Sequence, residues 1–263
     1  MFAKLLTYAL FVTFALARPN ARLGDRLARR AAGVHTSSPK IPSNGPASLT
    51  TNVTHAEFSS NWAGAAFESP AGTFKSVTGT FVVPTPRAPS GGSGTFAASA
   101  WVGIDGDTCG SAILQTGIDF TVSGGRVSFD AWFEYFPAAA TDFSGIPISA
   151  GNTIRLTATV STTTSGTVKI ENLSTGVTVS RALTSSARLC QENAEWIVED
   201  FEEGNSMVPF ANFGTVTFTN AVATEASGST VGPSGAVIIN MEQNGQVLTS
   251  VSTSSSSVTV NHT

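Results

Sequence analysis

From about residue 55 onward, short segments that alternate apolar and polar residues follow one another, and no window keeps a 3.6-residue apolar period. Turn signals separate these segments, among them Ser123-Gly124-Gly125, Thr164-Ser165-Gly166, Ser174-Thr175-Gly176 and Asn244-Gly245. The pattern predicts strands at residues 75–83, 97–104, 111–122, 127–136, 153–161, 167–172, 177–183, 195–201, 214–221, 236–241 and 246–251. Strands this short and regular over roughly 200 residues predict an all-β protein, a single antiparallel β-sandwich of two packed sheets.

The first 54 residues differ in composition from the rest. Residues 1–17 combine Lys4, an apolar run and the small-x-small site Ala15-Leu16-Ala17, which predicts a secretory signal peptide. Residues 18–54, called the leader below, are rich in Pro, Ser, Asn, Thr and Arg and read as a basic prosegment. No later segment approaches the roughly 20 apolar residues of a membrane helix. We therefore expect a secreted, extracellular protein without a membrane span, whose folded domain, called the body, is residues 55–263.

Charge is distributed unequally between these parts. Of 14 basic and 18 acidic residues in the chain, seven basic residues and one acid fall within residues 1–54, so the body carries a net charge of −10. A basic leader beside an acidic body predicts electrostatic docking of the leader as an intramolecular inhibitor, released when acid neutralises the carboxylates. A flexible linker is the alternative interpretation. The acidic body also argues against nucleic acid as a partner.

Several kinds of catalytic site are disfavoured by residue positions. The histidines are His35 in the leader, His55 at the start of the body and His262 at the C-terminus, which argues against a His-activated nucleophile and a His-based zinc site. Cys109 and Cys190 of an exported chain favour a disulfide over a reactive thiolate. Carboxylates, amides and aromatic rings remain. N-glycosylation sequons begin at Asn52, Asn172 and Asn261.

The strand period of two sorts the remaining candidates by face. One face carries Trp101, Gly103 and Asp105 in WVGID, Gln115, Gly117 and Asp119 in ILQTGID, Asp130, Trp132, Glu134 and Phe136 in DAWFEYF, and Glu195, Ile197, Glu199 and Phe201 in AEWIVEDF. Side by side, such faces would form a polar, aromatic-lined concave groove for an extended polymer. The five carboxylates of AEWIVEDFEE repel one another, which raises their pKa values and is typical of functional sites.

Other interpretations of the same residues stay open at this point. An acidic strand is often a solvated face, clustered carboxylates suit calcium, and the tryptophans can be packing residues. Glu134 and Glu199 on neighbouring strands would also suit the acid and nucleophile of a glycoside hydrolase, or a carbohydrate-binding sandwich.

Six segments in the same order carry a resemblance to a known family. They are SSNWAGA (59–65), AWVGIDGDTC (100–109), AILQTGIDF (112–120), DAWFEYFP (130–137), NAEWIVEDFEE (193–203) and VPFANF (208–213). Together they closely resemble the fungal glutamic peptidases, also called eqolisins. The resemblance implies an acid endopeptidase on a sandwich of two antiparallel sheets, acting on proteins and peptides without metal or cofactor and insensitive to pepstatin. We expect such an enzyme to be a monomer.

The resemblance also assigns roles to residues. It implies Glu199 and Gln115 as the catalytic pair, and Cys109 and Cys190 as a disulfide beside the two catalytic strands. The supporting groove residues would be Trp101, Asp105, Asp119, Asp130, Trp132, Glu134 and Glu202. In this scheme Glu199 is the general base that activates a water, and Gln115 donates its amide hydrogens to the developing oxyanion.

Overall fold

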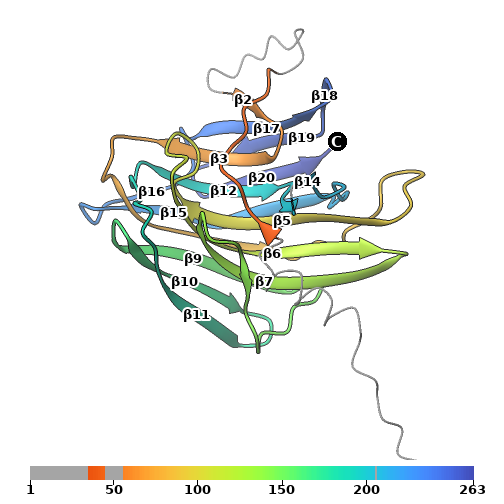
Figure 1. Cartoon of the computed structure of the whole chain (residues 1–263), viewed down its shortest axis with the longest axis horizontal. Coiled ribbons are helices and arrows are strands. Elements are labelled where there is room, and N and C mark those ends of the chain that lie inside the picture. Colours follow the sequence, from red (N-terminus) through yellow and green to blue (C-terminus); the bar gives the residue numbers. More distant parts are fainter. Residues whose placement is uncertain (1–34, 45–55, 205) are drawn as a thin grey trace, which may run out of the picture.

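The computed structural model describes residues 35–44, 56–204 and 206–263, which form strands and turns. Two large sheets pack face to face, with a third small sheet at their side (Figure 1). Every strand pair is antiparallel except β2 with β17. The described residues include no helix that is long and apolar enough to cross a membrane. The predicted all-β sandwich is therefore confirmed.

The sheet that carries the candidate residues, called the groove sheet, has nine strands in the order β18-β17-β3-β12-β5-β6-β7-β8, with β2 paired to β17. Its strands are β2 (Ala56–Ser59), β3 (Trp62–Glu68), β5 (Thr95–Ile104), β6 (Ile113–Ser123), β7 (Arg126–Phe136), β8 (Thr141–Asp142), β12 (Asn193–Glu199), β17 (Val237–Gln243) and β18 (Gln246–Val247).

The second large sheet, called the outer sheet, has eight strands in the order β11-β10-β9-β4-β15-β20-β19, with β16 paired to β15. Its strands are β4 (Phe74–Val82), β9 (Thr153–Thr162), β10 (Ser165–Asn172), β11 (Val177–Thr184), β15 (Thr215–Glu225), β16 (Thr230–Val231), β19 (Thr249–Thr253) and β20 (Ser257–His262). The small sheet joins β1 (His35–Thr36), β13 (Glu202–Glu203) and β14 (Ser206–Met207).

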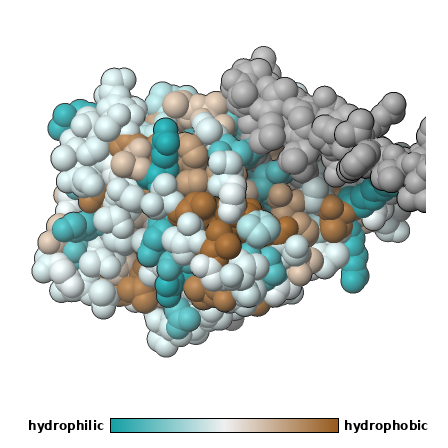
Figure 2. Space-filling view, turned by 90° about the horizontal axis from the view of Figure 1, so that it is seen from below, coloured by the Kyte–Doolittle hydropathy of each residue, from teal (hydrophilic) through white to brown (hydrophobic). Residues whose placement is uncertain are grey.

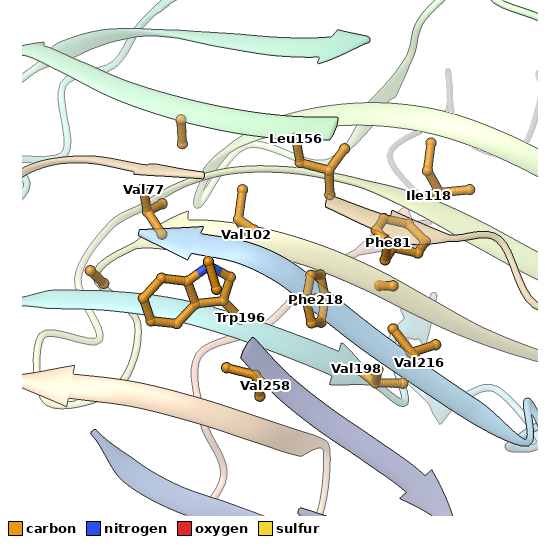
Figure 3. Packing of buried hydrophobic residues seen from close by; sticks show 14 of the residues in the cluster. Val77, Phe81, Val102, Ile118, Leu156, Trp196, Val198, Val216, Phe218 and Val258 are labelled. Carbon is orange, nitrogen blue, oxygen red and sulfur yellow. The ribbon is translucent and has the colours of Figure 1, made fainter. Parts of the chain in front are cut away.

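The main core lies between the two large sheets, where alternate residues of each strand meet (Figure 3). Trp196 and Val198 of β12 point into it, as the period of two predicts, and face Phe218 and Val216 of the outer sheet. The Trp196 indole N–H donates to the Thr78 carbonyl at 2.8 Å, so its one polar atom is satisfied. Burial of each side chain of this size contributes about 1.5–3 kcal/mol to the free energy of folding.

Seen from below, the surface is mainly polar with small apolar areas (Figure 2).

Turn chemistry confirms some boundaries and corrects others. Asn244 and Gly245 both have positive φ, 54° and 79°, as a two-residue turn between β17 and β18 requires. Gly166, by contrast, lies within β10 and not in a turn. A Cβ there would lie 2.3 Å from Leu114 of the opposite sheet, so this glycine permits close packing of the sheets.

Other differences from the predicted strands have physical causes. β3 was not predicted, because its WAGAAFE sequence is built of small residues that are buried on both faces and do not alternate. The predicted strand 246–251 is divided at Leu248, where the chain passes from the groove sheet to the outer sheet. β20 was also missed.

The sequon at Asn172 does not suit glycosylation, because its side chain is buried and its amide nitrogen donates to the Pro147 carbonyl at 2.8 Å. Asn261 is partly exposed, and its side-chain oxygen accepts a hydrogen bond from Thr215. Asn52 lies outside the described residues. Glycosylation at Asn52 and Asn261 stays a prediction.

Gly117 provides a test of packing within the groove sheet. A Cβ there would lie 2.6 Å from Trp101 Cβ and 2.7 Å from the Trp132 ring. We expect Gly117→Ala to lower the free energy of unfolding by about 1–3 kcal/mol through overpacking. Urea unfolding measures this. Gly110→Ala, where the added carbon meets nothing closer than 3.7 Å, is the matched control and should change stability by less than about 0.5 kcal/mol.

Candidate active site

Three rows of side chains cross the face of the groove sheet that points away from the sandwich core, because the registers of β12, β5, β6 and β7 align them. The rows are Glu199, Ser99, Asp119 and Asp130; Ile197, Trp101, Gly117 and Trp132; and Glu195, Gly103, Gln115 and Glu134. The opposite face carries the sandwich core. The assignment of faces from the period of two is thus confirmed, and the rows define one candidate site, called the groove.

Residues 35–44 of the leader lie across this groove (Figure 1). At one end His35 and Thr36 form β1 and pair with β13. At the other end the Ser43 amide N–H donates to the Phe58 carbonyl at 3.0 Å. The described part of the leader therefore runs over β6, β5, β12 and β3 as an extended peptide would.

A single peptide group of the leader contacts both members of the proposed catalytic pair. Gln115 Nε2 donates to the Ser37 carbonyl oxygen at 3.2 Å, and the Ser38 N–H donates to Glu199 Oε1 at 3.1 Å. The C=O and N–H of a trans peptide point in opposite directions, so the two side chains flank the Ser37–Ser38 peptide bond. In this placement Gln115 can polarise the carbonyl group. Glu199 lies beside the peptide nitrogen, which is the leaving atom when a peptide bond is cleaved.

Glu199 is held in a closed environment. It is fully buried, and the Trp101 indole N–H donates to its Oε2 at 2.8 Å. Burial raises the pKa of Glu199 to about 8, although the hydrogen bonds from the leader and from Trp101 act in the opposite direction. With the leader in place, the protonated form of Glu199 is therefore favoured over a wider pH range than in an exposed glutamate. A protonated carboxyl cannot serve as a general base.

Glu134 orients Gln115. Its Oε2 accepts from Gln115 Nε2 at 3.2 Å and from the Ser37 N–H at 3.1 Å. Gln115 Oε1 is buried and has no hydrogen-bond partner within the described part of the chain, which leaves it able to accept a hydrogen bond from a water. The carboxamide is thus fixed with its donor toward the peptide carbonyl.

Aromatic rings and one carboxylate surround His35, the first described residue of the leader. Its ring centroid lies 4.2 Å from that of Phe201 and 5.7 Å from that of Trp132. His35 Nδ1 lies 3.5 Å from Asp119 Oδ2. The Trp132 indole N–H donates to Ser99 Oγ at 3.0 Å, which fixes the ring. These residues form one end wall of the groove.

Asp105, expected as a supporting residue of the groove, makes its hydrogen bonds at the end of the strand. It ends the aligned strand segment with φ of 70°, and its carboxylate accepts from the backbone N–H groups of Gln191, Glu192 and Asn193. All three contacts hold the turn before β12, so Asp105 positions that strand and is not a substrate-contacting residue. The alternation rule does not apply beyond Ile104, where β5 ends.

Two further supporting residues lie at the edge of the site. Glu202 belongs to β13, which pairs with the leader, and its Oε2 accepts from Ser38 Oγ at 3.4 Å. Asp130 pairs with Asp119 across β6 and β7 and is half-buried. It shares the groove face with Asp119.

Sequence reasoning missed two residues that bind the leader main chain. Trp62 Nε1 donates to the Ser38 carbonyl at 3.0 Å. Asn61 Nδ2 donates to the Pro39 carbonyl at 3.1 Å, and its Oδ1 accepts from the Ile41 N–H at 2.8 Å. Both residues belong to the SSNWAGA segment, which is one of the six segments that resemble the glutamic peptidases. That resemblance could have pointed to them, whereas Trp62 considered alone is expected to be a packing residue.

The leader contributes one described cation to the docking. Lys40 Nζ forms ion pairs with Asp107 and Glu57 and is 8% exposed. Burial raises the pKa of Asp107, although Lys40 acts in the opposite direction. The arginines on which the charge argument depends, Arg18 to Arg30, lie outside the described residues. The described leader docks through main-chain hydrogen bonds and through the side chains of His35, Ser38 and Lys40.

The predicted disulfide between Cys109 and Cys190 is confirmed. It joins the turn after β5 to the segment before β12, across 81 residues of sequence. Closing a loop of this length stabilises the fold by about 4 kcal/mol in the chain-entropy description. The bridge thereby ties together two strands that carry the site.

Comparisons with known proteins match this chain to characterised peptidases. A family model described as the Peptidase A4 family matches residues 60–262. Aspergillopepsin-2 of Aspergillus niger is 47% identical over 99% of each chain, and scytalidopepsin B of Scytalidium lignicola is 43% identical over 80% of this chain and 81% of its own.

Two solved structures are also similar. Scytalido-glutamic peptidase bound to a transition-state analogue inhibitor matches with a TM-score of 0.71 and 41% identity, covering 78% of this chain and 98% of that one. Aspergilloglutamic peptidase of Aspergillus niger matches with a TM-score of 0.62 and 54% identity, covering 64% and 99%. Nearly all of each solved chain matches a part of this one.

Glu195 allows a test of how buried carboxyls affect stability. It is fully buried, without a hydrogen-bond partner among the described residues, and burial followed by the charges of Asp105 and Asp107 raises its pKa well above the usual value. The pKa of Glu195 is therefore higher in the folded than in the unfolded protein. Such a group stabilises the fold fully at a pH below its unfolded-state pKa, and the stabilisation is lost as the pH rises through its folded-state pKa.

We therefore expect Glu195→Gln to increase stability at neutral pH and to flatten the fall in stability between about pH 4 and about pH 7. Each pKa unit removed is worth about 1.4 kcal/mol. Urea unfolding over this pH range measures the effect. Glu225→Gln, which makes the same change of charge at the end of β15, is the control. An unchanged pH profile for Glu195→Gln would contradict the expectation.

Proposed function

This chain belongs to the peptidase A4 family, the glutamic peptidases or eqolisins, and is a hydrolase; from this premise we propose that it is a secreted acid endopeptidase with a Glu199–Gln115 dyad, insensitive to pepstatin. The observation that carries the proposal is the Ser37–Ser38 peptide group, which Gln115 and Glu199 contact from opposite sides. A groove that binds an extended main chain in this way suits a peptide substrate.

The reaction needs a base, an oxyanion donor and an acid. Ionised Glu199 takes a proton from a water, and the water attacks the carbonyl carbon of the substrate. Gln115 Nε2 donates to the carbonyl oxygen as it becomes negative, at the place where it now contacts the Ser37 oxygen. Glu199 then gives its proton to the departing nitrogen, beside which its Oε1 already lies. Bond cleavage consumes one water and leaves the dyad unchanged.

The acid pH range follows from the choice of groups. A carboxamide does not titrate, so Gln115 keeps its role in acid. When the leader leaves, water reaches Glu199, the effect of burial weakens and its pKa falls from about 8 toward the ordinary glutamate range. Asp119 and Glu134 share the groove with Glu199, and like charges held this close together repel one another.

The leader acts as an intramolecular inhibitor in this proposal. Its Ser37–Ser38 peptide group lies between the catalytic side chains, and it shields Glu199 from water. Lys40 supplies the electrostatic part through Asp107 and Glu57. Because burial raises the pKa of Asp107, this ion pair loses its charge at a higher pH than an exposed pair would, which favours release in acid.

The carbohydrate alternative is less well supported. Glu134 would have to serve as an acid or nucleophile with Glu199, but its Oε2 accepts hydrogen bonds from Gln115 and from the Ser37 N–H. These contacts make it an orienting group for a carboxamide and a peptide.

At about pH 3 the acid-treated chain should digest a denatured protein in the presence of pepstatin and leave glucans intact. Gln115→Ala removes the oxyanion donor and should lower kcat by roughly 10²- to 10³-fold. Glu199→Gln removes the base and should abolish measurable turnover. Peptide release measured by reversed-phase chromatography reports both effects, and circular dichroism verifies the fold. Glu225→Gln is the charge-matched control. A fully active Glu199→Gln protein would falsify the assignment.

A synthetic leader peptide, residues 18–54, should inhibit the body competitively, and added salt should weaken the inhibition. The Lys40→Gln peptide should inhibit about tenfold less well, because one charge-assisted interaction is lost. Initial rates at several peptide concentrations give the inhibition constants. The Arg18→Gln peptide makes the same change of net charge and is the control. Equal losses for the two peptides would mean that overall charge, and not the Lys40 ion pair, governs docking.

A further inference from the structure

We propose that the recess formed by Asp107 and Glu57 is a substrate subsite that binds a lysine or arginine side chain at the third residue after the cleaved bond. The proposal rests on the proposed function. It assigns to the recess a second role beyond holding the leader, namely the selection of basic substrates.

The register of the leader defines the position. The Ser37–Ser38 bond faces the dyad, so Ser38, Pro39 and Lys40 are the first, second and third residues after it. The contacts that fix these residues are made by the main chain. The Lys40 N–H donates to the Gly106 carbonyl at 2.9 Å, and the carbonyls of Ser38 and Pro39 accept from Trp62 and Asn61. A substrate of any sequence can make the same contacts and would direct its third side chain into the same recess.

The recess is chemically suited to a cation. Lys40 Nζ is almost fully enclosed and contacts both Asp107 and Glu57, and the Asp107 side chain is completely shielded. A carboxylate oxygen of Glu68 lies within 4.8 Å of those of Asp107 and Glu57. Lys40 is the cation that forms ion pairs with Asp107 and Glu57 among the described residues. Departure of the leader would take this cation away from both acids, and a basic substrate side chain replaces it.

The recess is also held rigid without the leader. Asp107 lies between Asp105, which binds three backbone N–H groups before β12, and Cys109, which is bridged to Cys190. Both anchors belong to the body. A site that is already organised loses little entropy when a ligand binds. Lys40 thus occupies a preformed site that remains when the leader is gone.

The preference should depend on pH. The charged groups that face Asp107 are Lys40, Glu57, Glu68, Glu192 and, from β12, Glu195. All of those in the body are acids, so the recess attracts a cation only while some of them are ionised. The preference for a basic residue should therefore be weak at about pH 3 and grow toward about pH 5, as carboxylates ionise.

The test uses the full chain after acid treatment, separated from its released leader. A set of peptides has one cleavage bond, mapped by mass spectrometry, and differs only in Lys, Arg, Gln or Glu at the third residue after it. At about pH 5 we expect kcat/KM for the Lys and Arg peptides to exceed that for the Gln peptide by about tenfold. In Asp107→Asn the ratio should fall toward one, whereas Glu225→Gln should keep it.

Two results would overturn the proposal: equal kcat/KM for the Lys and Gln peptides, or an undiminished ratio in Asp107→Asn. If the protein cleaves no peptide at all, the proposed function fails. The cation site is then tested separately, by measuring how tightly the leader peptide binds. Calorimetric dissociation constants are then compared for the peptide of residues 35–44 and its Lys40→Gln counterpart. A tenfold difference that disappears in Asp107→Asn supports the cation site. Equal constants reject it.

Discussion

The antiparallel register of β12, β5, β6 and β7 is the constraint on which the site depends. It brings Glu199, Trp101 and Gln115 to one face, while Trp196 and Val198 of the same β12 enter the core. A shift of one residue in β12 would exchange these sets, burying carboxyls between the sheets and exposing the indole ring. The buried Trp196 therefore protects the alignment of the proposed dyad, because the proposed catalytic arrangement and the stable core require the same register.

A second theme is the burial of Asp105, Asp200 and Glu195, none of which forms an ion pair within the described residues. Asp105 accepts hydrogen bonds from backbone N–H groups, Asp200 accepts from the Gln243 amide, and Glu195 has no hydrogen-bond partner in the same part of the chain. Burial raises the pKa of each, and that of Asp200 reaches about 7. Protonation removes the cost of burying such groups, so the fold suits an acidic medium. With only seven basic residues, the body also gains little positive charge there.

Sequence alone predicted a large part of this structure where the pattern is local. Alternation identified most long strands and sorted Gln115, Glu134 and Glu199 onto one face, since the period of two is a property of the strand itself. It failed at Asp105, where the strand ends and φ turns positive, and at β3, whose small residues do not alternate. Pairing between distant segments leaves no periodic trace, so the position of the leader and its Lys40 contacts could not be predicted from the pattern.

The leader and the groove belong to one covalent chain, and this has a consequence for activation. A tethered segment meets its site at an effective concentration near the millimolar range, so even weak contacts keep the groove filled. One break between residues 44 and 56 turns the same contacts into an ordinary bimolecular equilibrium. The freed segment is then lost by dilution into the surrounding medium. Irreversibility thus comes from dilution into a large volume and needs no change in the groove.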